Sequence, residues 1–438
     1  MTFLSVSLLL SVARTPDCLV AVSDGEMIDF ARFHREVRIT ARYLRDAKVH
    51  QCALAFDNSY YFSVALFAAL YAEAAIILPP NNQAGTLTGI EAQGVAVLRD
   101  QSVISICDTT PEHIIFAPEK LKTGKISFYT SGSTGAPKII HKSLHQIEAE
   151  ISVLQETWGN ETKDCLTAAT VSHQHIYGLL FKVLWPLCAG RVFIADPILY
   201  WENIRPLAHE KCCLISSPAH LSRFPDQFKF VANIAFSSGG PLSLEAANAS
   251  EQHLSYRPIE VFGSTETGGI AFRQQTTNTT PWSKFSVVDL AETDGVLRVR
   301  SPYLDTAGWY QTNDMVALHS EKEFTLKGRN DRIVKVEGKR VSLIEIEIWI
   351  RAHEWIADAN VLLLTAGRKP LACVATLTEA GQEKLDSAGA FRFGQMIRQE
   401  MHGGFDLAAQ PKRWRFVAEI PENTEGKRLH RDLSALFD

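Results

Sequence analysis

Residues 127–140 read SFYTSGSTGAPKII, a strand-like lead followed by a run with two glycines, four hydroxyl residues and Lys138. Glycine lets backbone N–H groups turn inward, hydroxyls add donors and the lysine adds charge, so the run suits an anion such as phosphate. A flexible Gly/Ser linker is the alternative, which the ordered lead and the Pro-Lys ending disfavour. The run is no Walker A loop, because Lys138 precedes isoleucine and not Ser or Thr.

The composition is that of a globular protein with more than one domain. The chain has 438 residues, of which 46% are hydrophobic and 21% charged, and this length suggests two or three domains. The net charge of -5 argues against nucleic-acid binding as the main function, since such surfaces need a basic excess. The eight scattered cysteines form no C-x-x-C pair, so we expect neither a zinc site nor a disulfide framework.

The first residues, MTFLSVSLLLSVARTPD, have no basic start and no small-x-small cleavage site, so we interpret them as a helix and not as a secretion signal. No run of about 18 apolar residues free of charge follows, which disfavours a membrane span. We therefore expect a cytoplasmic protein without a membrane span.

Helix-like and strand-like segments alternate along the first part of the chain, which is the α/β pattern. The helix-like segments are residues 24–47 and 61–74, and the strand-like ones are 52–57, 75–79 and 95–99. Between residues 272 and 325, short alternating segments such as GVLRVRSP and MVALHS indicate antiparallel β structure.

Two domains are predicted from this distribution of helix-like and strand-like segments. We expect a large N-terminal α/β domain with a β-rich subdomain over residues 1–328, and a small C-terminal α+β domain over residues 329–438. The hinge between them is predicted near Asp331.

TSGSTGAPK at residues 130–138 resembles the signature loop of the adenylate-forming superfamily, which includes acyl-CoA synthetases, peptide-synthetase adenylation domains and luciferases. The resemblance implies that this loop binds the phosphates of ATP. The residues concerned are Thr130, Ser131, Gly132, Ser133, Thr134, Gly135 and Lys138.

VFGSTETGG at residues 261–269 is similar to the family motif that binds adenine, the α-phosphate and Mg²⁺. The resemblance places Phe262 on the adenine, Thr265 at the α-phosphate and Glu266 at the Mg²⁺, with Gly263 and Ser264 in the same nucleotide-binding turn. A metal suits this reaction because it neutralises the charge that moves to pyrophosphate.

Two further segments resemble nucleotide-binding parts of the family. SSGGPLS at 237–243 implies an adenine wall at Gly239, Gly240 and Pro241. GWYQTNDMV, which begins at Gly308, implies that Asp314 binds the ribose hydroxyls, as a carboxylate can accept from two neighbouring hydroxyls. Asn replaces the family's usual Gly just before this aspartate.

The last motifs lie in the predicted C-terminal domain. LKGRNDRIVKVEGKRVSLIEIE at 326–347 resembles the family's hinge region, with Arg329 near the ribose and Asp331 as the pivot of a mobile small domain. IPENTEGKRLHRDL at 420–433 resembles the C-terminal catalytic motif, which implies that Lys427 bridges the substrate carboxylate and the α-phosphate.

The segment at residues 171–187, VSHQHIYGLLFKVLWPL, indicates which class of carboxylic acid the protein would activate. Amino-acid-activating relatives carry an aspartate in this segment, and its absence here disfavours an amino acid. The segment resembles the corresponding run of aryl and acyl ligases, which places His175 at the pocket mouth to gate the acid or the thiol. A purely structural histidine is the alternative.

The resemblance as a whole implies an AMP-forming acid–thiol ligase that uses ATP and Mg²⁺. The chain looks most similar to stand-alone ligases of bacterial aryl polyene clusters, which load an aryl acid onto the phosphopantetheine of an acyl carrier protein. A general medium-chain or aromatic acyl-CoA synthetase, with CoA as acceptor, is the alternative. From other classes, a luciferase-like oxygenase and a non-catalytic binding protein stay open, although the second would be expected to lack Lys427 or Glu266.

Overall fold

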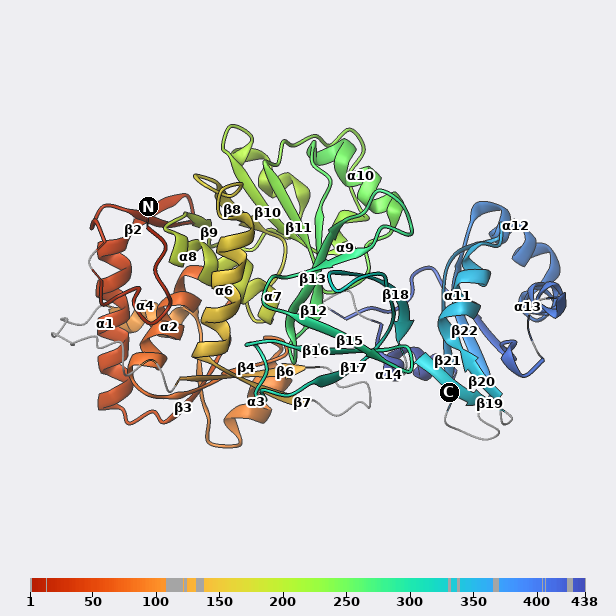
Figure 1. The fold of residues 1–438 in the computed structure, drawn as a ribbon, viewed down its shortest axis with the longest axis horizontal. Helices are drawn as coiled ribbons and strands as arrows, with labels where there is room; N and C mark the ends of the chain where they lie inside the picture. The colour runs from red at the N-terminus through yellow and green to blue at the C-terminus, as the bar shows by residue number, and fades with distance from the viewer. Residues whose placement is uncertain are drawn as a thin grey trace.

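The computed structural model describes residues 2–12, 14–107, 121, 124–130, 138–329, 332–336, 339–364, 370–403, 405, 407–423 and 428–437. In Figure 1 a large body, which contains the chain up to β18, lies beside a smaller body formed by the segments that follow. The large body holds two sheets, one of five strands and one of 13. The α/β class with a β-rich part is thereby confirmed.

The five-stranded sheet is built by the first half of the large body. Its strands lie in the order β5 (Ala96–Leu98), β3 (Gln51–Leu54), β4 (Ala75–Leu78), β6 (Lys125–Thr130) and β7 (Lys138–Ser143). All neighbours are parallel except β6 and β7. The helices of this region are α1 (Phe30–Asp46), α2 (Ser59–Tyr71), α3 (Ala84–Glu91) and α4 (Asp100–Cys107). Helices α1 and α2 begin where Asp29 and Asn58 cap them with side-chain oxygens, as N-cap residues do.

The 13-stranded sheet is part parallel and part antiparallel. The parallel strands are β1 (Leu19–Ser23), β9 (Phe193–Ile194), β8 (Leu166–Ala169), β10 (Cys212–Ser216), β11 (Ile234–Ser237) and β12 (Ile259–Ser264). On one side the hairpin strand β2 (Glu26–Asp29) pairs with β1. On the other side follow β13 (Gly268–Gln274), β14 (Trp282–Lys284), β18 (Glu323–Arg329), β17 (Tyr310–Leu318), β16 (Val296–Arg300) and β15 (Asp289–Thr293). This antiparallel part confirms the β structure expected between residues 272 and 325.

Helical segments connect the strands of the larger sheet. They are α6 (Leu144–Trp158), α7 (Ile176–Gly178), the π-helix η1 (Leu179–Leu184), α8 (Trp185–Ala189), η2 (Trp201–Leu207), α9 (Pro218–Leu221) and α10 (Leu244–Leu254). Where parallel strands end, their carboxyl ends open toward one edge of the sheet, which is the usual place for a ligand site in α/β proteins.

The smaller body begins with the hairpin β19 (Ile333–Val336) and β20 (Lys339–Ser342). A three-stranded sheet follows, with β21 (Ile356–Leu363), β22 (Leu371–Leu377) and β23 (Arg413–Phe416). Its helical segments are α11 (Leu343–Arg351), α12 (Glu379–Ala388), α13 (Ala390–Glu400), η4 (Met401–Gly403), η5 (Leu407–Ala409) and α14 (His430–Ala435). Because β18, which ends at Arg329, belongs to the large sheet, the chain leaves that sheet close to the predicted hinge. Asp331 itself lies outside the described residues, and the domain boundary stays a prediction.

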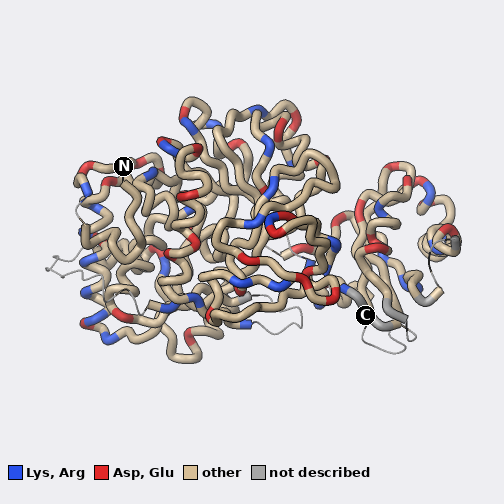
Figure 2. The backbone as a smooth tube through the Cα atoms, viewed as in Figure 1, with Lys and Arg blue, Asp and Glu red and all other residues tan. Residues whose placement is uncertain are grey.

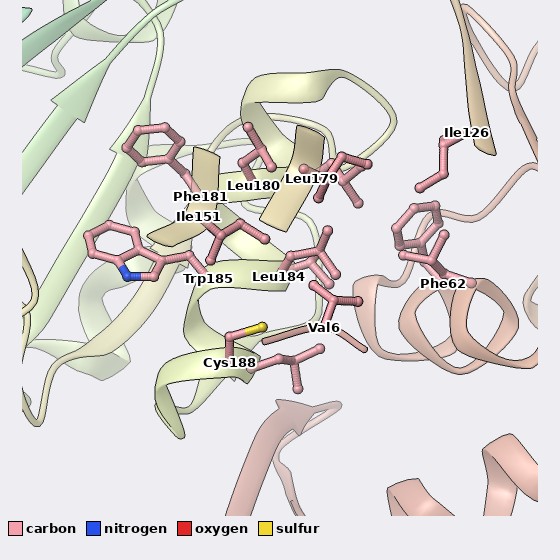
Figure 3. Packing of buried hydrophobic residues seen from close by; sticks show 14 of the residues in the cluster. Val6, Phe62, Ile126, Ile151, Leu179, Leu180, Phe181, Leu184, Trp185 and Cys188 are labelled. Carbon is pink, nitrogen blue, oxygen red and sulfur yellow. The ribbon is translucent and has the colours of Figure 1, made fainter. Parts of the chain in front are cut away.

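One hydrophobic cluster joins the two sheets of the large body. Figure 3 shows Phe62 of α2, Ile126 of β6, Ile151 of α6 and Leu184 and Trp185 of the η1–α8 segment packed in this core. These side chains are exposed by 1% or less, and each contributes about 2 kcal/mol through the apolar surface it removes from water. The core fixes α6 and η1, which frame the candidate site.

The start of the chain differs from the prediction. Residues 6–11 form turns and no helix, with hydrogen bonds such as Val12 N–H to Leu8 O at 3.0 Å. The helix expected from residue 24 begins only at Phe30, since residues 19–29 pair as the β1–β2 hairpin. Apolar spacing alone missed this hairpin because Asp24 and Gly25 turn the chain at positive φ, a local effect that periodicity does not report. Among the described residues, no helix is long and apolar enough to cross a membrane.

Charged residues of both signs are interspersed over the two bodies in the view of Figure 2. One charged side chain, by contrast, lies inside the core. Lys182 of η1 is only 2% exposed, and burial lowers its pKa to about 8, an effect that the nearby Asp196 opposes. Its charge also helps to keep the pKa of His173, which is buried beside α2, below its ordinary value, although burial is the main cause.

We expect Lys182→Met to raise the free energy of unfolding by about 2 kcal/mol at pH 7, because a buried charge is replaced by an apolar side chain of similar length. Between pH 8 and 10.5 the unfolded chain binds a proton that the folded protein has released, so wild-type stability rises with pH there. The variant should lack that rise. Denaturant unfolding at pH 7 and pH 9.5 measures both effects, with the exposed Lys163→Met as control; equal stability of wild type and Lys182→Met would contradict the prediction.

Candidate active site

The predicted phosphate loop joins two paired strands. Strand β6 runs antiparallel to β7, and Thr130 at the end of β6 lies opposite Lys138 at the start of β7. Ser131, Gly132, Ser133, Thr134 and Gly135 lie outside the described residues, as does the side chain of Thr130. The segment is therefore the connection of a hairpin within a sheet, which disfavours the linker interpretation of this run.

The turn between β12 and β13 carries the next predicted residues. Ser264 N–H donates to Thr267 Oγ1 at 3.1 Å, and Thr267 N–H donates to Ser264 Oγ at 3.2 Å. Gly263 packs so closely on the Gly268 carbonyl that a Cβ would lie 2.2 Å from that oxygen. This turn fixes the backbone of Thr265 and Glu266, whose side chains are half-buried.

Lys138 and Glu266 come together across the two sheets. The Lys138 Nζ lies 3.5 Å from Glu266 Oε1, although the residues belong to β7 and to the β12–β13 turn. The end of the predicted phosphate loop therefore meets the predicted metal-binding carboxylate. Such a pair suits a bound phosphate and its cation. The phosphate can replace the Glu266 carboxylate beside Lys138, and the cation can replace the Lys138 ammonium beside Glu266.

The predicted adenine wall follows β11. Gly239 has φ +92°, a conformation that favours glycine, and Gly239, Gly240 and Pro241 are all exposed. The Ser238 hydroxyl donates to Val261 O at 2.8 Å, which ties this loop to β12 just before Phe262. The Phe262 ring is half-buried beside Trp282 and Phe324, with ring centroids 5.5 and 6.0 Å away.

The predicted ribose residues face each other on neighbouring strands. Asp314 of β17 lies opposite Arg329 of β18, with Arg329 Nη1 3.5 Å from Asp314 Oδ1. Burial raises the pKa of the Tyr310 hydroxyl, which also senses the charges of Glu266, Lys138, Arg329 and Asp314. These four charged residues thus lie within electrostatic range of one tyrosine and share one region of the surface.

A family model described as AMP-binding enzyme matches residues 117–294. The chain is 26% identical over 321 residues to a 4-coumarate–CoA ligase of Cereibacter sphaeroides, with 72% of each protein covered. It superposes on ATP-bound MatB from Rhodopseudomonas palustris with a TM-score of 0.81 at 17% identity and 98% coverage of both chains. The AMP complex of O-succinylbenzoate CoA synthetase from Bacillus subtilis gives a TM-score of 0.77 at 16% identity, with 99% of this chain and 98% of that chain covered.

The chain therefore resembles adenylate-forming enzymes, in sequence over residues 117–294 and in fold over nearly its whole length. The match to the AMP-binding enzyme family and the CoA ligase relatives support an AMP-forming acid–thiol ligase, a class that activates a carboxylic acid with ATP to an acyl-adenylate. Both solved relatives hold adenine nucleotides, ATP in one and AMP in the other.

The donor set of this candidate site fits Mg²⁺. No group of three or more His, Cys, Asp or Glu residues that could hold a metal occurs in the described part of the chain. Mg²⁺ is commonly held by one or two carboxylates together with water and substrate phosphates. Glu266, 27% exposed and paired with Lys138, offers one such carboxylate.

Sequence reasoning missed two residues beneath the Glu266 turn. Lys142 of β7 is 2% exposed, and its ammonium donates to Glu266 O and Tyr303 O, each at 2.8 Å. The buried Glu150 of α6 accepts from Gly269 N–H at 2.7 Å. Burial lowers the pKa of Lys142 and raises the pKa of Glu150, while their mutual attraction opposes both shifts.

The sequence does carry a signal for this support. Gln146 and Glu150 are four residues apart and so share one face of α6. Gln146 caps the helix with Ser143 and donates to Asp305 Oδ1 at 2.9 Å. Polar residues at this spacing inside an apolar helix indicate a buried polar contact.

His175 and Lys427 complete the predicted site residues. His175 occupies the N-cap position of α7, is half-buried, and its carbonyl accepts from Leu179 N–H at 2.8 Å. Gly178 allows this helix to pack on the Ser172 carbonyl, where a Cβ would lie 1.9 Å away. Lys427 lies outside the described residues, between Asn423 and Arg428.

The Asp314–Arg329 pair yields a test of nucleotide binding. We expect Asp314→Asn to raise the KM for ATP about tenfold with little change in kcat, because a ribose contact is made equally in ground and transition states. The wild type should discriminate against 2′- or 3′-deoxy-ATP, and the variant should lose that discrimination. Steady-state kinetics with the three nucleotides measure this; a variant that discriminates as strongly as the wild type would refute the ribose role.

Proposed function

We propose that the enzyme activates an aryl acid with Mg·ATP and passes the aryl group to the phosphopantetheine thiol of an acyl carrier protein. The convergence of Lys138, Glu266, Asp314 and Arg329 around Tyr310 carries the nucleotide part of this proposal. A general aromatic or medium-chain acyl-CoA synthetase is the second candidate, favoured by the CoA ligase relatives.

In the first half-reaction, the formation of the acyl-adenylate, each predicted site residue has a separate role. Lys138 and the loop before it hold the phosphates, Thr265 lies at the α-phosphate, and Asp314 with Arg329 holds the ribose. Mg²⁺ on Glu266 would neutralise charge on the phosphates as pyrophosphate leaves. Lys427 offsets the repulsion between the carboxylate and the α-phosphate as they meet, so that the protein mainly positions groups and distributes charge.

The second half-reaction needs a different arrangement around the same adenylate. We infer that residues 329–438 turn about Asp331, withdraw Lys427 and admit the thiol, as enzymes that share one site between two steps require. In the present arrangement the two bodies touch through an exposed ion pair, with Arg223 Nη2 2.9 Å from Glu419 Oε1. An exposed pair of this kind contributes only about 0–1 kcal/mol and so allows the movement.

A cluster of aromatic rings packed in the core beyond His175 supports an aryl substrate. The Tyr177 ring lies 4.9 Å from the Phe181 ring, which lies 5.2 Å from Phe236 at the end of β11. The buried Tyr177 hydroxyl lies against the Ser216 backbone, and burial raises its pKa well above the ordinary value. A flat aryl acid bound beside this cluster would find favourable contacts, because aromatic rings prefer offset or edge contacts with one another. Among relatives of the same fold is a benzoate CoA ligase from Burkholderia xenovorans, with a TM-score of 0.78 at 16% identity and with 98% of this chain and 99% of that chain covered.

Competition between holo acyl carrier protein and CoA tests which thiol accepts the aryl group. Residues 329–438 carry 17 basic and 16 acidic residues, against 27 and 33 in the rest, and a relatively basic small domain suits either an acidic carrier or the phosphates of CoA. The enzyme, ATP and a hydroxybenzoate are incubated with equal amounts of holo acyl carrier protein and CoA, and both thioesters are quantified by mass spectrometry. We expect the carrier thioester to form faster; faster formation of the CoA thioester would favour the second candidate, and oxygen uptake without a thioester would indicate a luciferase-like oxygenase.

A further inference from the structure

A cavity of about 450 Å³ lies at the amino ends of β11 and β12. Ile234 and Ile259, the first residues of these two strands, line it together with Trp158, the last residue of α6. The predicted nucleotide residues Gly239 and Glu266 follow the opposite, carboxyl ends of the same strands. The volume is within the range of small-molecule sites in proteins, about 300–1,000 Å³.

The Trp158 ring lies between this cavity and the aromatic cluster beside which the aryl acid is proposed to bind. Its centroid is 4.9 Å from Phe236 and 6.4 Å from Phe181, two rings of that cluster. It is also 5.1 Å from Phe272, which lines the cavity. Phe236 and Ile234 share one face of β11, about 7 Å apart along the strand. Trp158 therefore contacts the cluster on one side and the cavity on the other.

The position of Trp158 is fixed by its surroundings. Its carbonyl, at the end of α6, accepts from Thr162 N–H at 3.0 Å and from the Thr162 hydroxyl at 2.8 Å. The ring is 5% exposed and makes a further edge contact with Phe285, with centroids 5.5 Å apart. A closely packed aromatic ring of this kind forms a rigid wall.

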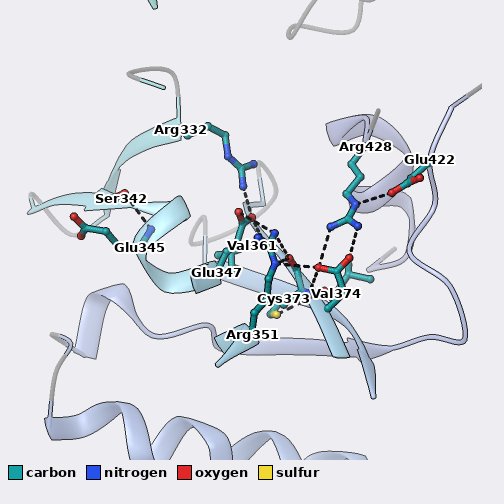
Figure 4. A network of polar contacts seen from close by, with 12 residues as sticks. Arg332, Ser342, Glu345, Glu347, Arg351, Val361, Cys373, Val374, Glu422 and Arg428 are labelled. Carbon is teal, nitrogen blue, oxygen red and sulfur yellow. Dashed lines mark hydrogen bonds and ion pairs between the residues drawn. The ribbon is translucent and has the colours of Figure 1, made fainter. Parts of the chain in front are cut away.

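The charged residues of the cavity do not favour an anionic occupant. The Arg273 guanidinium is already paired with Glu260 at 2.7 Å, as buried charges in proteins commonly are. Figure 4 shows the same for Glu347 of the smaller body, which contacts two arginines. Glu161 and Glu323 add carboxylates to the cavity lining, and these repel an anion. The buried apolar walls therefore suit an uncharged tail.

We propose that this cavity is a continuation of the acid site that Trp158 closes off, so that the Trp158 ring limits the length of the acid that the enzyme activates. The wild type accepts aryl acids that end at this ring, and it rejects acids with a longer uncharged chain para to the carboxyl group. This inference deepens the proposed activation of an aryl acid and rests on it.

ATP–pyrophosphate exchange with benzoate and its 4-methoxy, 4-butoxy and 4-hexyloxy derivatives tests this limit. We expect the kcat/KM of the wild type to fall by at least about tenfold from the methoxy to the hexyloxy acid, because a closed pocket rejects added methylenes. In Trp158→Ala the chain can enter the cavity, and kcat/KM should rise by up to about fourfold for each methylene that is buried.

Trp158→Phe is a milder variant that carries the test if Trp158→Ala does not fold. It should also use the longer acids better than the wild type does, with a smaller gain. A wild type that uses the hexyloxy acid as well as the methoxy acid would overturn the proposal. A folded Trp158 variant whose dependence on chain length matches that of the wild type would overturn it too.

Filling the cavity shows where the chain binds. In Trp158→Ala/Ile259→Phe the larger side chain occupies the cavity, so the gain with the hexyloxy acid should disappear. The thermal unfolding temperature gives a readout without turnover, because the hexyloxy acid should raise it in Trp158→Ala and not in the double variant. An equal gain in both variants would show that the chain binds elsewhere.

Trp201→Ala is the matched control, because Trp201 is 4% exposed but packs in a separate hydrophobic cluster. This variant should lose stability and keep the chain-length dependence of the wild type. If it used the hexyloxy acid as well as Trp158→Ala does, the gain would come from a loosened fold and the proposal would be overturned. If the wild type showed no exchange with any acid, the proposed function itself would fail.

Discussion

We expect Glu266→Gln to lower ATP–pyrophosphate exchange by about 100-fold, the effect of removing one well-placed charge partner from a reacting phosphate. The amide keeps the size of the side chain but is a poor ligand for Mg²⁺. The backbone carbonyl of Glu266, which holds Lys142 at 2.8 Å, is unaffected, so the turn should keep its structure. Exchange is measured over a range of Mg²⁺ concentrations, and the variant should need a higher concentration for half-maximal rate.

The control for Glu266→Gln is Glu202→Gln, an exposed glutamate on η2. Equilibrium binding of Mg·ATP, measured by calorimetry in the absence of acid, gives a readout that does not depend on turnover. Wild-type exchange and wild-type affinity in Glu266→Gln would show that this carboxylate does not hold the metal.

We expect the second large effect, a loss of stability, from Lys142→Met. The substitution leaves the Glu266 and Tyr303 carbonyls without their donor and leaves Glu150 buried without its nearest opposing charge. Removing one partner of a buried charge pair lowers the free energy of unfolding by about 3–5 kcal/mol. Denaturant unfolding measures this loss, and Mg·ATP affinity should fall with it because the Glu266 turn is no longer fixed from below.

A double-mutant cycle tests whether Lys142 and Glu150 act together. Glu150→Gln can still accept from Gly269 N–H while it removes the negative charge. The combination Lys142→Met/Glu150→Gln should therefore recover part of the stability that Lys142→Met alone loses. Purely additive losses would indicate that the two charges do not support each other.

The fold was predictable from the sequence where packing and periodicity agree. Strands such as β3 and β4 are short apolar runs between turns, and helix α2 is an apolar run behind the N-cap Asn58, so their burial on nearly every side follows from composition. The β1–β2 hairpin was missed because its turn depends on the positive φ of Asp24 and Gly25, a local conformation that apolar spacing does not report. The initial apolar segment was predicted as a helix and forms turns instead, since apolar spacing does not distinguish a short buried turn from a helical one.

The candidate site was predictable only in part, for a physical reason. Motifs indicate residues that are expected to touch the ligand. Lys138, Glu266, Asp314 and Arg329 were predicted in this way, and the structure pairs Lys138 with Glu266 and Arg329 with Asp314. Residues that hold the motifs in place, such as Lys142, are recognised by which carbonyl they meet in space, and no local pattern encodes a contact between β7 and the β12–β13 turn.

Acid-dependent ATP–pyrophosphate exchange by the wild-type enzyme tests the central claim most directly. The panel contains hydroxybenzoates and other aryl acids, medium-chain acyl acids and α-amino acids, each with Mg·ATP. We predict strong exchange with at least one aryl acid, weaker exchange with acyl acids and background exchange with amino acids. Exchange with an amino acid above that with every aryl acid, or no exchange with any acid, would contradict the assignment of this chain as an aryl-acid-adenylating ligase.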